Sequence, residues 1–211
     1  MFHYSLVHWT TFFTAVFLLN ISPGPDMAFI LGQTARGGRK GGFAAMFGIW
    51  SGTFIHVIMA ALGLSIILAA SAVAFSVVKW AGAAYLVWIG IKAIFAKGME
   101  TGEDDVSETK VSLKEIYRQG VLVSALNPKV AIFFLAFLPQ FIVEGAGPAN
   151  IQLFIHGSLI IVAAGFVEPP LVLAGAGLAG KLKKNEKIGQ WLERSLGALF
   201  IFLGIRLAVG E

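Results

Sequence analysis

The chain has 211 residues, of which 57% are hydrophobic and 13% are charged, and its mean hydropathy is +0.80. This composition is too apolar for a soluble domain, so we expect a membrane protein that sits in the lipid bilayer. The absence of cysteine excludes disulfides and thiolate chemistry. The net charge of +4 does not indicate nucleic-acid binding, because the basic residues lie in short loops between apolar segments.

Six apolar segments are long enough to cross a bilayer, which takes about 20 helical residues. They are 6–31, 43–70, 72–96, 120–143, 151–180 and 192–209. The sequence predicts one all-α transmembrane domain over 1–211, in which a charged cytoplasmic loop at about 98–115 separates a repeat at about 1–97 from a second at about 116–211. Because each repeat has three spans, the second repeat is expected to be inverted relative to the first.

The basic residues indicate how the chain is oriented in the membrane. If the N-terminus is outside, the inner loops carry most of the lysines and arginines: Arg36, Arg39, Lys40, Lys97, Lys110, Lys114, Arg118, Lys181, Lys183, Lys184, Lys187 and Arg194. The outer loops then keep only Lys79 and Arg206. The positive-inside rule therefore predicts a multi-pass protein with both termini on the outer side.

Proline motifs interrupt the first and fourth spans. Asn20 and Ile21 precede Ser22-Pro23-Gly24-Pro25-Asp26 in the first span, and Asn127-Pro128-Lys129 lies in the fourth. Asn and Ser cap helix N-termini and Pro suits the first helical position, so each motif is expected to start a half-helix within the membrane. In inverted repeats the two positive helix ends would meet from opposite sides, where a carboxylate fits. The alternative is that the prolines only kink packed helices.

Four ionisable residues within the predicted spans are candidates for the site, because a charge at the centre of a membrane helix costs about 2.5–3.5 kcal/mol: Asp26, His56, Lys129 and Glu168. Asp26 and Lys129 each follow a proline, and we expect them to form an ion pair or to contact a substrate. Alternatively, Asp26 satisfies its own helix end and Lys129 extends to water. Glu168 precedes Pro169-Pro170, which is expected to break the fifth span. A carboxylate beside freed carbonyls suits an ammonium group or a transported proton, so Glu168 and Asp26 are the candidates for proton coupling.

Polar residues elsewhere in the spans are secondary candidates, namely Asn20, His56 and Gln140. His56 shares a helix face with Gly48 and Gly52, a spacing that lets another helix approach closely, so an interface role is favoured over a place in the pathway wall. His156 is expected to be structural, near the membrane surface. The tryptophans include anchors at the membrane surfaces and therefore give no indication of the substrate: Trp9, Trp50, Trp80, Trp88 and Trp191.

No enzymatic pattern is present in the sequence. The four histidines lack metal-ligand spacing, and the glycine-rich segment at 37–42 has no preceding strand that would make it a phosphate cradle. We therefore expect no catalytic residue, no cofactor and no metal. The energy for transport would come from an ion gradient or from the substrate's own gradient.

The two proline motifs together resemble the LysE/RhtB family of bacterial amino-acid exporters. Residues 22–26 resemble the family's N-terminal signature, and Asn127-Pro128-Lys129 with Phe133-Phe134 and 138–141, which includes Gln140, resembles its signature in the fourth span. The resemblance covers the whole chain. It implies inverted three-helix repeats, export of amino acids or close derivatives across the bacterial inner membrane by proton antiport, and a possible homodimer.

The charges of the predicted pathway suit a zwitterion. The substrate carboxylate would lie at the half-helix starts near Ser22–Asp26 and Asn127–Lys129, and its ammonium group would face Glu168 or Asp26. Homoserine, threonine and leucine are the kinds of substrate that the resemblance suggests. The alternative is a small cation or metal exporter of the same architecture, although the central loop has no histidine.

Overall fold

The computed structural model describes residues 4–22, 24–64, 72–95 and 112–184, together with part of 191–209. The described chain is helical, with no strand among these residues. Pro23, the charged loop as far as residue 111 and much of the predicted sixth span lie outside the described residues. The helical elements are α1 (Leu6–Ile21), α2 (Pro25–Met59), η1 (Ala60–Leu64), α4 (Ala72–Phe95), α5 (Leu113–Ala125), α6 (Pro128–Ile132), η2 (Phe133–Phe137), η3 (Leu138–Phe141) and α7 (Ala149–Lys184).

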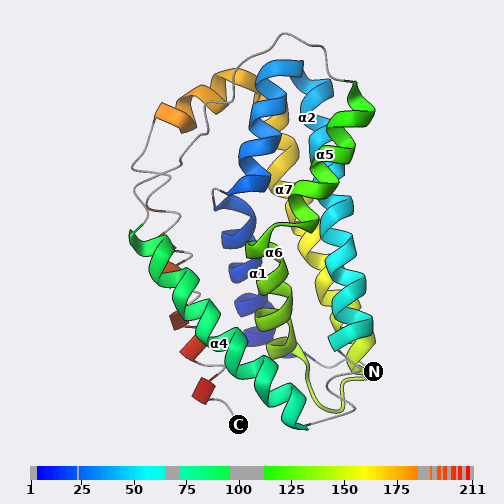
Figure 1. Ribbon diagram of the computed structural model, residues 1–211, viewed down its shortest axis with the longest axis vertical. Coiled ribbons are helices and arrows are strands. Elements are labelled where there is room, and N and C mark those ends of the chain that lie inside the picture. The colour runs from blue at the N-terminus through cyan, green and yellow to red at the C-terminus, as the bar shows by residue number, and fades with distance from the viewer. Residues whose placement is uncertain are drawn as a thin grey trace.

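Helix α2 folds back on itself at Gly38, so its two arms run in opposite directions (Figure 1). Gly38 has φ of 61° and ψ of −161°, a conformation that glycine adopts without a steric penalty. The arms then touch, because a Cβ added at Gly41 would lie 2.7 Å from the carbonyl oxygen of Gln33. The glycine-rich segment 37–42 therefore makes a tight reversal.

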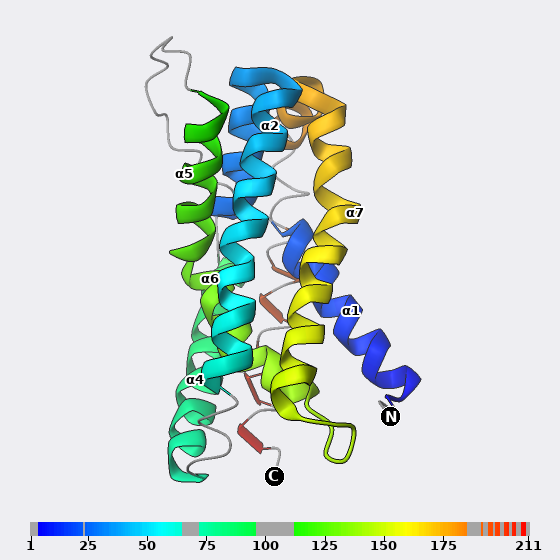
Figure 2. The same cartoon turned by 90° about the vertical axis from the view of Figure 1, so that its right-hand side faces the viewer.

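The second arm of α2 lies between α5 and α7 (Figure 2). Glycines let α2 and α5 approach backbone to backbone, since a Cβ at Gly52 would lie 2.5 Å from the Val121 oxygen and one at Gly120 would lie 2.7 Å from the Ala45 oxygen. A Cβ at Gly48 would meet the Tyr117 carbonyl. The close helix contact predicted from Gly48 and Gly52 is thus confirmed, with α5 as the partner.

Helices end and restart at both proline motifs. Helix α1 ends at Ile21 and α2 begins at Pro25 with Gly24 as its N-cap. The expected helix start at Ser22-Pro23 is therefore wrong, because the Ser22 backbone N–H donates to the Leu18 carbonyl and Ser22 ends α1 instead. Helix α5 ends at Ala125, α6 begins at Pro128, and the chain bends by 47° between them. After that bend the chain continues through the π-helix η2 and the 3₁₀-helix η3.

The expected break at Pro169-Pro170 is wrong, because α7 continues through both prolines. The φ angle of proline, about −65°, matches that of an α-helix, so the rings fit, although two backbone hydrogen bonds are lost. Tertiary contacts offset this loss. Val172, two residues beyond Pro170, is fully buried. It packs in a cluster whose other buried members are Ile30, Ala45, Met46, Ile49 and Ile116.

Among the described residues, two helical segments are individually long and apolar enough to span a membrane, Pro25–Gly63 and Ala149–Ala174. The bent pair formed by Leu113–Ala125 and Pro128–Phe141 would be a third such segment. The protein is therefore an all-helical membrane protein. The division into six spans and two inverted repeats stays a prediction.

Candidate functional site

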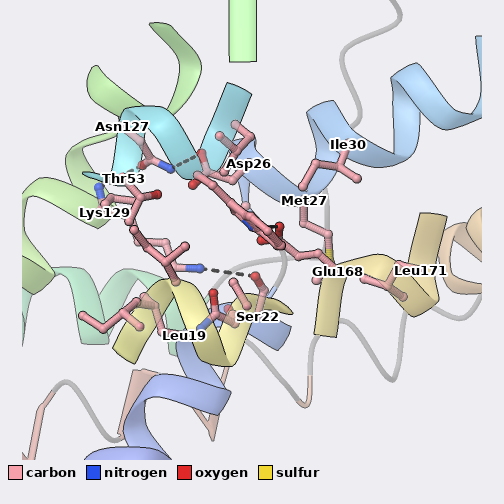
Figure 3. A pocket seen from close by; sticks show the side chains of 18 of the residues that line it. Leu19, Ser22, Asp26, Met27, Ile30, Thr53, Asn127, Lys129, Glu168 and Leu171 are labelled. Carbon is pink, nitrogen blue, oxygen red and sulfur yellow. Dashed lines mark hydrogen bonds between the residues drawn. The ribbon is translucent and has the colours of Figure 1, made fainter. Parts of the chain in front are cut away.

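A cavity lies in the middle of the molecule, between the end of α1, both arms of α2, the α6–η2 region and α7 (Figure 3). Its polar lining comes from both proline motifs and from α7: Asn20, Ser22, Gly24, Asp26, Thr53, Asn127, Lys129 and Glu168. Its volume, measured as the space open to the centre of a water molecule, is about 50 Å³. One water needs roughly 10–15 Å³ on this measure, so the cavity has room for a few waters.

Two helix N-termini meet at this cavity. The first arm of α2 and helix α6 both start in the middle of the molecule and leave it in opposite directions (Figure 1). Asn127 caps α6, because its side-chain oxygen accepts a hydrogen bond of 3.0 Å from the Lys129 backbone N–H. The start of α2 has no side-chain cap, because its N-cap residue is Gly24. Two opposed helix starts give this part of the cavity a partial positive charge.

Hydrogen bonds tie the two motifs together across the cavity (Figure 3). The Asn127 amide donates to the Asp26 carboxylate over 2.8 Å. The Lys129 ammonium donates to the Ser22 carbonyl over 3.3 Å. Ser22 and Asn127 are both 4% exposed. Residues 101 and 107 positions apart in sequence therefore form one polar cluster, as the sequence predicts, and the ion pair between Asp26 and Lys129 stays a prediction.

Glu168 reaches the cavity from α7, and its carboxylate accepts a 2.6 Å hydrogen bond from the Trp50 indole N–H. Only 7% of Glu168 is exposed. The tryptophans had no predicted place in the site, whereas the Trp50 side chain lines the cavity. Trp50 reaches inward since α2 packs against α7 on this side of the arm.

The remaining wall of the cavity is apolar, contributed by Leu19, Met27, Ile30, Ile49, Trp50, Val130, Phe134, Ile160, Ile161, Ala164 and Leu171. Most of these residues are aliphatic and come from α1, α2 and α7. The site thus combines one cationic group, two acidic groups and a hydrophobic surface within a single small cavity.

Of the secondary candidates, Asn20 lines the cavity while its amide donates to the Val16 carbonyl. His56 is buried between α2 and α5, where its Nε2 lies 3.2 Å from the Ser124 carbonyl oxygen, in agreement with the interface interpretation. Gln140 lies in η3, away from the cavity, and its amide donates to the Ala136 carbonyl. Pro25 and Pro128 start helices and do not line the cavity, and Pro23 lies outside the described residues.

Sequence reasoning missed the apolar wall of the site and two residues that form hydrogen bonds there, Trp50 and Thr53. Thr53 lies 3.0 Å, oxygen to oxygen, from Ser124 on α5. No pattern in the sequence singles out Trp50, which lies on the opposite side of the helix from the Gly48 and Gly52 face. His156 is 1% exposed in a cluster of aromatic rings, and its position near the membrane surface stays a prediction.

A largely apolar helical chain with a central polar cavity at two helix starts defines the class of multi-pass membrane transporters, not enzymes. Residues 17–211 match the family model described as LysE type translocator, and the chain belongs to this family. It is 31% identical over 206 residues to the leucine efflux protein of Salmonella typhimurium. The aligned region covers 96% of this chain and 95% of that protein. The same figures hold for the leucine efflux protein of Salmonella typhi.

A third relative is YrhP of Bacillus subtilis, described as an uncharacterized membrane protein. The identity is 33% over 196 residues, with 90% of this chain and 92% of that protein covered. No solved structure matches the chain.

Proposed function

We propose that the protein is a secondary active exporter that exchanges leucine-like amino acids for protons. The observation that carries this proposal is the central cavity, which presents charges of both signs beside an aliphatic wall. The leucine efflux proteins named above support an amino acid as the substrate.

The substrate carboxylate would bind at the two opposed helix starts. The backbone N–H groups at the start of α2 have only a glycine cap, and Lys129 supplies a full positive charge beside them. A Cβ at Gly24 would lie 3.4 Å from the Lys129 ammonium, so the glycine leaves this approach open. Helix N-termini and an ammonium group together form a recurrent carboxylate site.

The substrate ammonium would face Glu168, with Asp26 as the second acidic group on the same cavity. A buried carboxylate is stable either as the neutral acid or opposite a cation. Glu168 would therefore hold a proton when the substrate is absent and release it when the ammonium group binds. This competition for one carboxylate makes the exchange of substrate for proton obligatory.

The aliphatic wall would accept the side chain of the substrate. Met27, Ile30, Ile49 and Leu171 offer no hydrogen-bond partner for a hydroxyl group. An apolar pocket nevertheless rejects a hydroxylated analogue only about 100-fold at best. We therefore expect leucine-like substrates to be preferred, with threonine and homoserine as weaker ones.

We propose an inner-membrane location with the turn of α2 on the cytoplasmic side. The end of the molecule that holds this turn also holds the start of α5 and the end of α7 (Figure 1). Arg36, Arg39 and Lys40 lie at the turn, and Lys114 and Arg118 lie in the first turns of α5. The positive-inside rule then puts this end in the cytoplasm and both termini outside.

The test is uptake of labelled amino acids into inverted membrane vesicles, with and without a pH gradient, because inverted vesicles turn export into accumulation. We expect leucine uptake that depends on the gradient, and loss of that dependence in the Glu168→Gln variant. Glu144→Gln is the matched control, since Glu144 is exposed and lies outside the cavity. Gradient-dependent uptake at the native rate in Glu168→Gln would remove Glu168 from the mechanism.

The alternative class, a small cation or metal exporter, is examined in the same vesicles with labelled divalent metals. Metal uptake without amino-acid uptake would replace our proposal with that one. Amino-acid uptake that ignores the pH gradient in the native protein would retain the substrate class and overturn proton exchange.

A further inference from the structure

A second cluster of titratable groups lies away from the cavity, where the start of α1 packs on α7. The Nε2 atoms of His8 and His156 are 2.8 Å apart, a hydrogen-bond distance. Trp9 stacks on the His156 ring at 5.3 Å, and Phe12 and Phe141 meet that ring edge-on or tilted. The transport scheme above makes no use of this pair.

The neighbouring groups fix which nitrogen carries each hydrogen. Nδ1 of His156 lies 2.8 Å from the Gln152 carbonyl oxygen, which can only accept, so Nδ1 carries the hydrogen. Nε2 of a neutral His156 is then a bare acceptor, and His8 donates through its own Nε2. In the described part of the chain, Nδ1 of His8 has no hydrogen-bond partner, so this nitrogen can take up a proton while the bond between the rings persists.

The other groups around the pair do not titrate at neutral pH. Tyr4 stacks on His8 at 4.5 Å and donates to the Gln152 side chain, and burial raises the pKa of Tyr4 above its ordinary value, so it stays neutral. No carboxylate joins these two histidines among the described residues, which hold no group of three or more potential metal ligands. The pair therefore responds to protons without a compensating charge nearby.

We propose that His8 and His156 form a proton-binding latch that holds α1 on α7 and releases it when both imidazoles are charged. The first proton, on His8, leaves the ring-to-ring bond in place. The second must go to Nε2 of His156, which removes the acceptor and sets two cations against each other in a buried position. A charge on His8 also opposes the helix dipole, because His8 lies in the first turn of α1.

Release of this contact would loosen the packing between the histidine pair and the cavity. One buried hydrophobic cluster connects the histidine pair to the cavity. It includes Leu19 and Ile160, which line the cavity, and Phe12, Phe137 and Phe141 near the pair. The start of α1 lies at the opposite end of the molecule from the turn of α2 (Figure 1). The distribution of Lys and Arg predicts that this end faces outside, where a proton gradient supplies acid.

The spacing of the pair suits a proton and not a metal ion. Metal ions bond to imidazole nitrogen at about 2.0–2.1 Å each, so a metal held between the rings would need a larger separation than the observed one. The ligand of this site is therefore the proton itself.

The absence of cysteine in the native chain allows spin labels to be placed at two positions only. Leu6→Cys and Ile151→Cys put one label on each helix, and both native side chains are exposed. The distance between the labels is measured in lipid nanodiscs at about pH 8 and at about pH 4, well below the ordinary imidazole pKa of about 6.5, because the second proton must bind beside an existing charge. No substrate is added, so the result does not depend on the proposed transport function.

We expect a longer distance to gain population at the lower pH, and to be populated at both pH values in His8→Lys, which carries a fixed charge. His8→Gln and His156→Gln should remove the pH response, and two variants are used so that a folding defect in one does not decide the result. His56→Gln, which changes a buried histidine in the other helix interface, should keep it. Identical distances at both pH values, or an unchanged response in both glutamine variants, would overturn the latch.

Discussion

Asn127 performs two tasks in this structure, and substitutions at this position separate them. Its oxygen caps α6 and its amide nitrogen donates to Asp26. Loss of an N-cap costs about 0.5–2 kcal/mol, and loss of a hydrogen bond to a charged group costs about 1.5–3 kcal/mol. Asn127→Ala should therefore be destabilised by about 2–5 kcal/mol, whereas Asn127→Ser, which keeps a capping oxygen, should lose only the second contribution.

Asn127→Asp makes a sharper test because it keeps the cap and places a second carboxylate beside Asp26. Two charges about 4 Å apart repel by about 4 kcal/mol at an effective dielectric constant of 20. The repulsion is relieved when the two carboxylates share a proton. The variant should therefore lose stability as the pH rises, and regain it as the pH falls, relative to Asn127→Ser.

Thermal unfolding of the purified variants in one detergent, followed by intrinsic fluorescence at several pH values, measures these effects. Ser112→Ala is the matched control, since Ser112 caps α5 at the start of a different helix and has no partner across the cavity. An Asn127→Asp variant whose stability relative to Asn127→Ser does not change with pH would refute the contact with Asp26.

Three further predictions concern other parts of the fold. Gly38→Ala should lower the free energy of unfolding by about 1–2 kcal/mol because φ is positive there, whereas Gly37→Ala, with open space around it, should not. Equal unfolding temperatures for the two variants would show that the turn is assigned to the wrong residue. Gly52→Ala should weaken the contact between α2 and α5 by about 1–3 kcal/mol, measured in the same way, and native stability would contradict the close packing. Trp50→Phe removes the donor to Glu168 and should alter the pH profile of vesicle uptake, whereas Trp80→Phe, on an exposed side chain, should not.

The parts of the fold that could be predicted from sequence are those that depend on local chemistry. For the first motif, the preferences of Ser and Pro for helix starts predicted a start at Ser22-Pro23, whereas α2 begins at Pro25. For the second motif, Asn at the N-cap and Pro at the first helical position identify where α6 begins, because these preferences act within a few residues. The glycine spacing at 48 and 52 likewise predicted a close helix contact. Both signals are readable in one segment of chain without knowledge of its neighbours.

The parts that could not be predicted depend on neighbours far away in sequence. Trp50 was given no place in the site, since an aromatic residue in an apolar segment gives no sign of the direction it faces. Only the position of Glu168 in the fold shows the hydrogen bond that Trp50 makes. The two prolines of α7 were expected to break the helix, because the packing of Val172 that offsets their cost is invisible in the sequence. The contact of His8 with His156 joins positions 148 residues apart.

The continuity of α7 through Pro169 and Pro170 has a mechanical consequence. Neither proline has a backbone N–H, so the carbonyls one turn earlier, at Gly165 and Phe166, receive no hydrogen bond from within the helix. Bending α7 there breaks fewer bonds than bending it anywhere else along its length. Glu168 lies directly beside this point. A proton or cation that binds to or leaves its carboxylate therefore acts at the place where α7 bends most easily.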